Sequence, residues 1–272
     1  PINISSMSCN VFINNKRKVI ISHGVDWRLT KNTFSDRYRR KSAINLYKNL
    51  GSDIIVANDT NFLREIGVEL KNTKAFCEVQ ENIWFVPNCI DTYNFYEDRS
   101  VKKEKIILCP RNIRWERGIH LAIEVFHKFH KFSKYKEYKL VILGGPLKGR
   151  YYNSCLLLVK KYELQDCINF NGSVDSETMK SYYRRSMLTI IPTIEQEGTS
   201  LSALESMACG TPVVSTSNGG LVDLPTVKSK TESKDMSEKI KSTLENYDQI
   251  KNNQMHETHT LFNMHNWTKA WR

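Results

Sequence analysis

Long apolar runs are absent from this sequence of 272 residues. The longest, such as Lys105–Cys109 and Leu140–Leu143, have the length of a strand, far below the roughly 18 residues that a membrane-spanning helix needs. Hydrophobic residues make up 40% of the chain and charged residues 25%, which is ordinary for a globular protein that buries a core. We therefore expect no membrane-spanning protein, and the length predicts roughly two domains.

Closely spaced cysteine pairs are also absent. The seven cysteines are scattered, odd in number, and form no Cys-x-x-Cys pair. This pattern favours reduced core thiols in a cytosolic protein over disulfides or a cysteine-ligated metal. His127 and His130 are three residues apart, as are His256 and His259, but no third ligand is indicated near either pair. We expect surface histidines and no bound metal.

Acidic residues are too few to balance the basic ones, and the formal net charge is +11. This excess attracts anionic partners, whether nucleotide, nucleic acid or acidic lipid, without selecting among them. A solvated lysine-rich surface explains the charge as well as a functional patch does. No recognised nucleic-acid-binding module is present, so we expect no nucleic-acid partner. The cluster of Arg37, Arg39, Arg40 and Lys41 fits contact with an acidic membrane face and a solvated helix face equally well.

Short β-branched runs alternate with longer amphipathic stretches, which predicts an α/β fold with parallel sheets. In the first part we expect helices over about 33–50 and Asp59–Ile66, and strands at Lys18–Ser22, Asp53–Ala57 and Asn82–Val86. Residues 1–17 are polar and are expected to be irregular. Residues 93–105 are predicted to form a linker, which divides the chain into domains 1–100 and 101–272.

The second part has a more regular pattern. Strands are expected at Ile106–Cys109, Leu140–Leu143, Ile168–Asn171, Leu188–Ile191 and Pro212–Ser215. Helices are expected at about 118–133, Tyr151–Tyr162, Ser176–Arg185, Leu201–Cys209 and in the tail from about Asp235, with Ser176 as an N-cap. This alternation predicts a doubly wound Rossmann-like domain, in which ligands bind at the carboxyl ends of the strands.

The end of the first of these strands carries two arginines. Arg111 and Arg117 flank a loop that leads into a helix N-terminus. Free amides and the positive end of the helix dipole favour an anion there, and guanidinium groups add bidentate bonds suited to phosphate. Taken alone, the pair is better explained as two surface arginines of a basic protein.

A second strand end carries two glutamates. Glu197 lies in the loop after Leu188–Ile191, and Glu205 follows eight residues later in the expected helix. The glycine and small polar residues between them let a ligand approach the backbone amides at the helix start. Because a carboxylate can accept two hydrogen bonds from vicinal hydroxyls, two of them can hold a sugar and a ribose.

The segment EGTSLSALESMACGTPVVS resembles the donor-site motif of retaining glycosyltransferases of the GT-B fold, the large family four of nucleotide-sugar enzymes. Other landmarks of that family occur in the same order. PRNIRWERGIHLAIEVF resembles its phosphate-binding loop and helix, and LVILGG its next strand. NGGLVD, VPNCIDTYNF, FNMHNWTKAW and the His-Gly loop HGVDWR resemble further family motifs. The resemblance covers about residues 18–272.

The resemblance implies a role for each matching residue. Glu205 is expected to bind the ribose, and Arg111 and Arg117 the diphosphate. Glu197 is expected to hold the transferred sugar, and His23 to approach that sugar from the opposite wall. Further donor-binding positions are Gly144 and the backbone amides of Gly198, Thr199, Ser200 and Leu201.

The resemblance also implies a GT-B fold, with two Rossmann-like domains whose parallel sheets face a cleft. The front of the first domain is expected to be missing, which would leave an apolar sheet edge exposed. The implied reaction is sugar transfer, with retention and without metal or other cofactor, from a nucleotide sugar to a glycan or lipid-linked acceptor. We expect a role in surface polysaccharide synthesis and a cytoplasmic location, in peripheral contact with the inner membrane face. The alternative is a non-catalytic remnant that binds nucleotide sugar.

These roles predict that Arg117→Ala lowers turnover. Removal of one preorganised charge donor should cost about 2–4 kcal/mol of transition-state stabilisation, or roughly 30- to 1000-fold in rate. The family usually has lysine at this position, so the prediction tests whether the longer, planar arginine serves the same purpose. A turnover assay of the variant that gave near-wild-type rates would contradict it.

Overall fold

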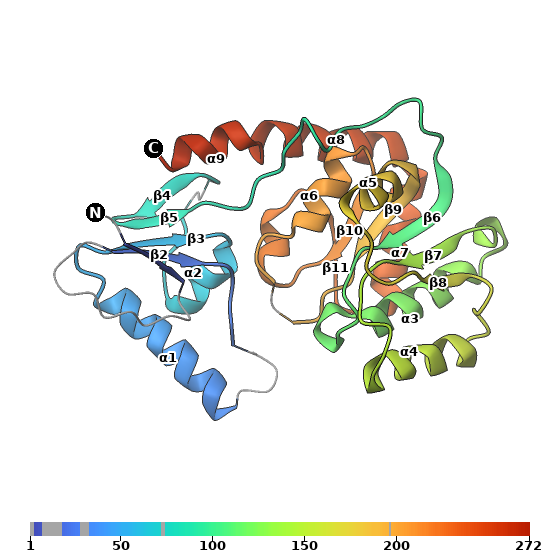
Figure 1. Cartoon of the computed structure of the whole chain (residues 1–272), viewed down its shortest axis with the longest axis horizontal. Helices are drawn as coiled ribbons and strands as arrows, with labels where there is room; N and C mark the ends of the chain where they lie inside the picture. Colours follow the sequence, from blue (N-terminus) through green and yellow to red (C-terminus); the bar gives the residue numbers. More distant parts are fainter. Residues whose placement is uncertain (1–2, 7–17, 28–32, 72–73, 196) are drawn as a thin grey trace.

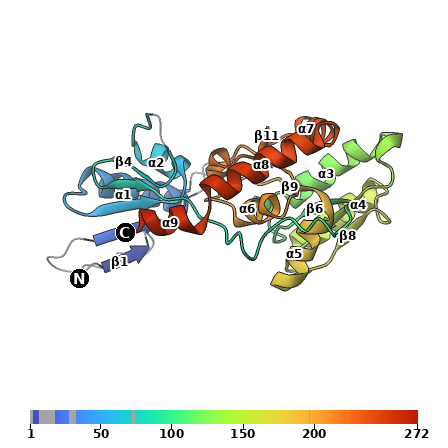
Figure 2. The ribbon, with the colours of Figure 1, turned by 90° about the horizontal axis from the view of Figure 1, so that it is seen from above.

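The computed structural model describes residues 3–6, 18–27, 33–71, 74–195 and 197–272, and only the backbone of residues 3–6. Two halves, each built around its own sheet, lie side by side along the long axis (Figure 1; Figure 2). Residues 86–103 connect them and form turns but no helix or strand. The expected linker falls within this connection except at its end, because the next strand already begins at Glu104.

The N-terminal half contains a five-stranded sheet in the order β1-β2-β3-β5-β4. Its pairs are parallel except β4 with β5, which are antiparallel. The elements are β1 (Asn3–Ser6), β2 (Lys18–Ser22), α1 (Phe34–Lys48), β3 (Ile54–Ala57), α2 (Thr60–Ile66), β4 (Cys77–Gln80) and β5 (Ile83–Phe85).

Two features of this half differ from the sequence expectation. Asn3–Ser6 is a strand that pairs in parallel with β2, so the expectation of irregular backbone is wrong for these four residues; residues 7–17, and Arg28 of the His-Gly loop motif, lie outside the described residues. The strand β4 was not expected. Its side chains alternate between half-buried and exposed, which is typical of a short edge strand and gives little apolar signal.

The C-terminal half contains a six-stranded, all-parallel sheet in the order β11-β10-β9-β6-β7-β8. Its strands are β6 (Glu104–Cys109), β7 (Lys139–Ile142), β8 (Ile168–Phe170), β9 (Ser186–Ile191), β10 (Val213–Thr216) and β11 (Val227–Ser229). Its helices are α3 (Ile119–His130), α4 (Arg150–Lys161), α5 (Ser176–Arg185), α6 (Leu201–Ala208), α7 (Ser233–Glu245), α8 (Tyr247–Leu261) and α9 (Met264–Ala270). The 3₁₀ helices are η1 (Trp115–Arg117), η2 (Ser133–Tyr135) and η3 (Gly219–Asp223).

Helices cover both faces of this second sheet. Ile107 belongs to the core on the side of α3 and α7, whereas the next residue, Leu108, packs with Tyr183 of α5 on the other side. Strands buried on both faces have continuous apolar sequences, which is why five of the six were located well from sequence. The sixth, β11, was not expected, because it is short and its first two residues are only half-buried. The expected N-cap of α5, Ser176, is wrong by one residue: the side chain of Asp175 accepts the Thr178 N–H at 2.7 Å.

The C-terminal helices return to the first sheet. In both views α8 and α9 extend from the C-terminal half to the N-terminal half (Figure 1; Figure 2). Trp267 and Ala270 of α9 pack against a cluster formed by Val19, Val56 and Val86. The end of the chain therefore contributes to the core of the first half. Within the described residues, no helix is both long enough and apolar enough to cross a bilayer.

The N-cap of α2 is a buried carboxyl group. Asp59 follows β3, is 0% exposed, and accepts the Phe62 N–H at 2.7 Å through Oδ1. Its Oδ2 has no hydrogen-bond partner among the described residues. Burial, reinforced by the nearby Asp223 carboxylate and opposed by the helix amides and Arg64, raises the pKa of Asp59 to about 7.

A raised pKa makes stability depend on pH. The folded state holds the Asp59 proton more tightly than the unfolded chain, so from about pH 4 to about pH 7 the free energy of unfolding should fall as pH rises, then level off. Asp59→Asn keeps an N-cap acceptor but cannot ionise. In urea unfolding at pH 8 the Asp59→Asn protein should be more stable than the wild type by roughly a few kcal/mol. At pH 5 the gain in stability should be smaller.

Asp26→Asn, at an exposed carboxylate, is the matched control. It should change the free energy of unfolding by the same amount at pH 5 and at pH 8. The pKa of Asp223 is also raised, mainly by burial. The free energy of unfolding of the Asp59→Asn protein should therefore still fall with rising pH, although less than that of the wild type. Equal stability of the Asp59→Asn protein and the wild type at both pH values would contradict a titrating Asp59.

Candidate functional site

The order of the second sheet reverses between β6 and β9. The chain passes from β6 to β7 and β8 on one side, and then returns through α5 to place β9 on the other side of β6. Loops that leave adjacent parallel strands in opposite directions open a crevice at the carboxyl ends of those strands, where ligands of open α/β sheets bind. Arg111 and Arg117 follow β6, and Glu197 follows β9. The sheet topology thus places all three at this crevice.

Gly118 lets the two loops touch. It has φ 72°, and a Cβ at this position would lie 1.8 Å from the carbonyl oxygen of Pro192. Any side chain would therefore separate the loop after β6 from the loop after β9. The contact continues in the backbone, because the Ile194 N–H donates to the carbonyl of Glu116 at 3.0 Å.

Glu197 joins both arginines. Its Oε2 accepts a hydrogen bond from Nη2 of Arg111, and its Oε1 lies 3.2 Å from Nη1 of Arg117. The Thr193 hydroxyl donates to the same carboxylate at 2.7 Å and accepts from Arg111 at 3.0 Å. The side chains of Arg111, Glu197 and Arg117 are 7%, 10% and 33% exposed. Three of the four catalytic candidates therefore form one buried cluster, which we call the Glu197 cluster (Arg111, Arg117, Thr193, Glu197).

The charge state of the Glu197 cluster follows from opposing effects. Burial raises the pKa of the Glu197 carboxyl, but the two guanidinium groups and the Thr193 hydroxyl outweigh it and leave the pKa below its ordinary value. Glu197 is therefore ionised at neutral pH, and the cluster carries one net positive charge. An anion that enters the crevice meets a guanidinium pair already engaged by an internal carboxylate.

The N-terminus of α6 lies in the same loop. Ser200 is its N-cap residue, but the Ser200 hydroxyl makes no capping bond and has no hydrogen-bond partner among the described residues, although it is buried. Nε of Arg111 is buried and unpaired in the same way. Buried donors are normally paired, and helix N-termini bind anions. This edge of the sheet can thus receive phosphate oxygens.

A cavity of about 330 Å³ adjoins the cluster, a size at the lower end of the range for small-molecule sites. Gly144, a predicted donor-binding residue, lines it together with both arginines. The remaining lining residues are Pro110, Asn112, Leu143, Ser173, Val174, Met179 and Ser202. All of these residues belong to the C-terminal half.

Glu205 lies one turn of α6 below Ser202 and does not line this cavity. Its Oε2 accepts a hydrogen bond from the Tyr183 hydroxyl at 2.9 Å. Burial raises the pKa of the Glu205 carboxyl, and the Tyr183 bond opposes that rise. Glu205 is therefore not a lining residue of the cavity, and a tyrosine from α5 orients its carboxylate.

His23 borders the donor loop through its backbone. A Cβ at Gly198 would lie 2.7 Å from the His23 carbonyl oxygen, so the two loops are in contact across the halves. The imidazole itself is exposed and does not line the 330 Å³ cavity. The structure thus brings the His23 loop to Gly198 but does not bring the His23 ring to the arginines.

Sequence reasoning missed several residues of this site. Thr193 follows β9 directly and carried a positional signal, because polar residues at strand ends of this sheet meet at one edge. Tyr183 gave no signal, because an aromatic residue inside an amphipathic helix is normally a core residue. Ser202 lies in the first turn of α6 and follows several small polar residues, so nothing in the sequence distinguished it.

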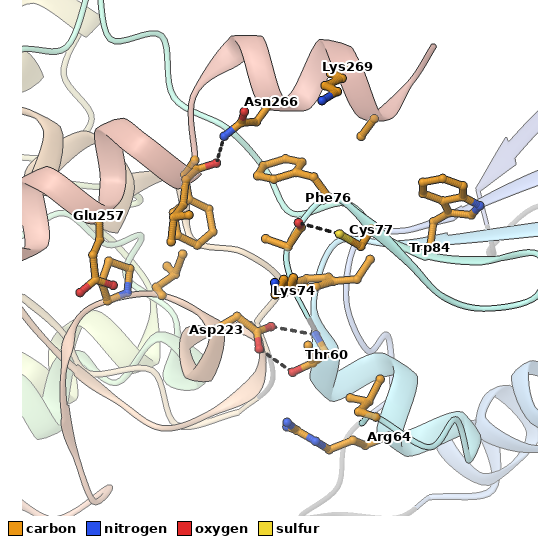
Figure 3. Close-up of a pocket in the computed structure, with 18 of the residues that line it drawn as sticks. Thr60, Arg64, Lys74, Phe76, Cys77, Trp84, Asp223, Glu257, Asn266 and Lys269 are labelled. Atoms are coloured by element: carbon orange, nitrogen blue, oxygen red, sulfur yellow. Dashed lines mark hydrogen bonds between the residues drawn. The ribbon is translucent and has the colours of Figure 1, made fainter. Parts of the chain in front are cut away.

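A larger cavity lies elsewhere. It measures about 1150 Å³ and opens between α2, β4 and β5 of the first half and the α8–α9 region of the second (Figure 3). None of the predicted site residues lines it. Its size alone does not make it the donor site, because the predicted residues Arg111, Arg117 and Gly144 line the smaller cavity. Among the described residues, no three His, Cys, Asp or Glu side chains are grouped to hold a metal ion.

Comparison with known proteins gives the family. The sequence profile described as "Glycosyl transferases group 1" matches residues 94–260. An uncharacterised glycosyltransferase of Methanocaldococcus jannaschii is 32% identical over 122 residues, 44% of this chain and 29% of the relative. A D-inositol 3-phosphate glycosyltransferase of Acidothermus cellulolyticus is 38% identical over 85 residues, 30% of this chain and 19% of the relative. The matches thus span less than a third of these relatives.

Solved structures show the fold. The Anabaena protein HepE, in a complex with UDP and glucose, has a TM-score of 0.75 at 16% identity, with 94% of this chain and 70% of that chain covered. A Staphylococcus aureus TarM variant in a complex that includes UDP has a TM-score of 0.73 at 17% identity, with 96% and 51% covered. These likenesses and the parallel sheets confirm the predicted α/β fold of GT-B type.

Proposed function

The chain belongs to the glycosyl transferases group 1 family, and from this premise we propose that it transfers a sugar from a nucleotide-diphosphate sugar to a glycan or lipid-linked acceptor. We assign it to glycosyltransferase family four and to retention of configuration, on the spacing of Glu197 and Glu205 and the resemblance of the segment around them. Surface polysaccharide synthesis is the proposed biological setting, and the WcaL relative of Salmonella typhimurium, described as a putative colanic acid biosynthesis glycosyltransferase, supports it.

The Glu197 cluster is the observation that carries this proposal. Two guanidinium groups, a helix N-terminus with an unpaired Ser200 hydroxyl, and a 330 Å³ cavity meet at the carboxyl ends of β6 and β9. This combination fits a nucleoside diphosphate better than a neutral ligand, because it offers positive charge and hydrogen-bond donors beside a cavity that apolar residues also line.

The proposed chemistry uses these groups on the leaving diphosphate. As the bond between the sugar and the diphosphate breaks, negative charge develops on the phosphate oxygens, and Arg111, Arg117 and the α6 amides stabilise that charge where it appears. Guanidinium groups supply the compensation that a divalent cation supplies in other sites, so we propose that no metal or other cofactor is required. We assign no side chain as general base.

The alternative is a chain that binds nucleotide sugar without transferring it. The internal pairing of Glu197 with both arginines favours this alternative, because it halves the positive charge available to the diphosphate. Transfer requires Glu197 to turn from the arginines to the sugar. Binding without transfer or hydrolysis would support the alternative.

The proposed acceptor side includes a membrane contact. The helix α1 exposes Arg37, Arg40 and Lys41, and its aromatic residues Phe34 and Tyr38 are 78% and 62% exposed. Basic residues with interleaved aromatic side chains bind the surface of anionic bilayers. We therefore propose peripheral contact of α1 with the acidic inner face of a membrane, which would hold a cytoplasmic protein beside a lipid-linked acceptor.

Calorimetric titration of the 272-residue chain with UDP and UDP-glucose tests the donor site, because structures of HepE with both are known. Glu205→Ala should weaken UDP binding by about 5- to 150-fold through unmet hydrogen bonds. Glu238→Ala, at an exposed position of α7, is the matched control and should bind as the wild type does. Binding should persist in EDTA. Identical titrations for the Glu205→Ala protein and the wild type would refute the assignment of Glu205.

Sedimentation with vesicles of anionic phospholipid tests the membrane contact. The double variant Arg37→Glu/Lys41→Glu should lose binding by at least about tenfold, since each basic residue near an acidic surface contributes about 1 kcal/mol. Lys160→Glu/Lys161→Glu makes the same charge change at exposed positions of α4 and should retain binding. Equal loss in both variants would point to net charge alone and contradict a specific role of α1.

A further inference from the structure

The segment after β3 fits between two glycine turns of the other half. A Cβ at Gly198 would lie 2.9 Å from both terminal side-chain atoms of Asn58, and a Cβ at Gly220 would lie 2.7 Å from the Cβ of Asp59. No side chain larger than hydrogen fits at either glycine while this segment is in place. Asn58, Asp59 and Thr60 are all buried, at 6%, 0% and 5% exposure.

Thr60 joins the two halves through a two-point contact. Its N–H donates to Oδ2 of Asp223 at 2.8 Å, and its hydroxyl donates to Oδ1 at 2.5 Å (Figure 3). Both carboxylate oxygens are thus bound by one residue across 163 positions of sequence. Hydrogen bonds to an ionised acceptor are stronger than bonds between neutral groups.

A second contact holds the donor loop itself. The Thr199 hydroxyl donates to the carbonyl of Asn58. From the connecting segment, Nδ2 of Asn88 donates to the carbonyl of Thr199 at 2.8 Å. Thr199 is therefore bonded on both sides to residues outside the C-terminal half, and the residue next to it, Ser200, is the N-cap residue of α6.

The Thr60–Asp223 contact connects to the Glu197 cluster by a short path. Asp223 ends the 3₁₀ helix η3, which begins at Gly219. Within that helix, the Gly220 N–H donates to the carbonyl of Glu197 at 2.5 Å. The position of the first half thus fixes η3, and η3 fixes the backbone of the glutamate that pairs with both arginines.

We propose that Asn58, Asp59 and Thr60 form a latch that positions the donor loop Glu197–Leu201 for the transferred sugar. The latch residues contact Gly198 and Thr199 of the donor loop and make no hydrogen bond to Arg111, Arg117 or Glu205 among the described residues, so they are positioning residues and not catalytic ones. This inference rests on the proposed function and extends it, because it assigns control of the donor loop to the half that carries His23.

The geometry predicts which ligand the latch affects. Every residue that lines the 330 Å³ cavity belongs to the C-terminal half, so the latch reaches a bound nucleoside diphosphate only indirectly, through the donor loop. The sugar must in addition contact the Glu197–Leu201 loop. Loosening the latch should therefore weaken the interaction with UDP-glucose and spare the interaction with UDP, the two probes introduced above.

Thr60→Val removes the hydroxyl and keeps the side-chain shape. It should lower kcat/KM for UDP-glucose, or its affinity where transfer is not measured, by about tenfold, the change expected for one lost hydrogen bond to a carboxylate. The Kd of UDP should change by less than about twofold. Thr60→Ser should restore the wild-type values, because serine provides the same donor.

Thr268→Val is the matched control, because the Thr268 hydroxyl is exposed and bonds only within α9. Hydrogen exchange supplies a readout that needs no substrate: Thr60→Val should speed exchange of the amides of 197–201 and leave β6 and β7 unchanged. Combined with Asp223→Asn, Thr60→Val should add little further effect, since the two changes break the same contact.

The outcomes separate the latch from the proposed function. A wild-type chain that binds neither UDP nor UDP-glucose would contradict the proposed function, while faster exchange in Thr60→Val would still support the latch as a structural contact. Wild-type binding of both probes, with Thr60→Val indistinguishable in affinity and exchange, would overturn the latch. Equal losses for UDP and UDP-glucose would also overturn it, because that pattern indicates general loosening of the site.

Discussion

The carboxylate of Glu197, held between two guanidinium groups, is the interaction on which the candidate site depends. A buried carboxylate without partners would be strongly disfavoured, and here Arg111, Arg117 and the Thr193 hydroxyl compensate it. The same contacts fix the arginines, whose side chains would otherwise repel each other in the crevice. In the proposed function this cluster serves two purposes: it balances charge in the absence of ligand, and it supplies charge to a diphosphate, so that ligand binding must redistribute its hydrogen bonds.

The sheet topology makes this cluster possible. Parallel strands end at one edge, and the reversal of order between β6 and β9 places their loops against each other. Gly118 lets these two loops pack closely, because a side chain there would collide with the backbone after β9. The sheet therefore brings together residues such as Arg111 and Glu197, which are more than 80 positions apart in the sequence.

The two halves of the chain contact each other next to the Glu197 cluster. The buried segment Asn58–Thr60 fills the space between the Gly198 loop and the Gly219–Gly220 turn, and Asp59 adds a carboxyl group whose pKa is raised by burial to about 7. A junction that contains buried, partly unpaired polar groups is less stable than an apolar one. Such a junction can be rearranged at modest cost in free energy, which suits the repositioning that the proposed function requires of the donor loop.

The sequence by itself determined the class of the fold and the identity of most charged residues in the site. Strands buried on both faces, such as β6 and β9, have continuous apolar sequences, and the spacing of Glu197 and Glu205 resembles a family motif. Only the tertiary structure decided that Glu197 pairs with both arginines, that Glu205 accepts a hydrogen bond from Tyr183, and that Thr60 binds Asp223. Local patterns record burial and turn chemistry, whereas these contacts join residues distant in sequence and depend on how the loops of separate strands pack together.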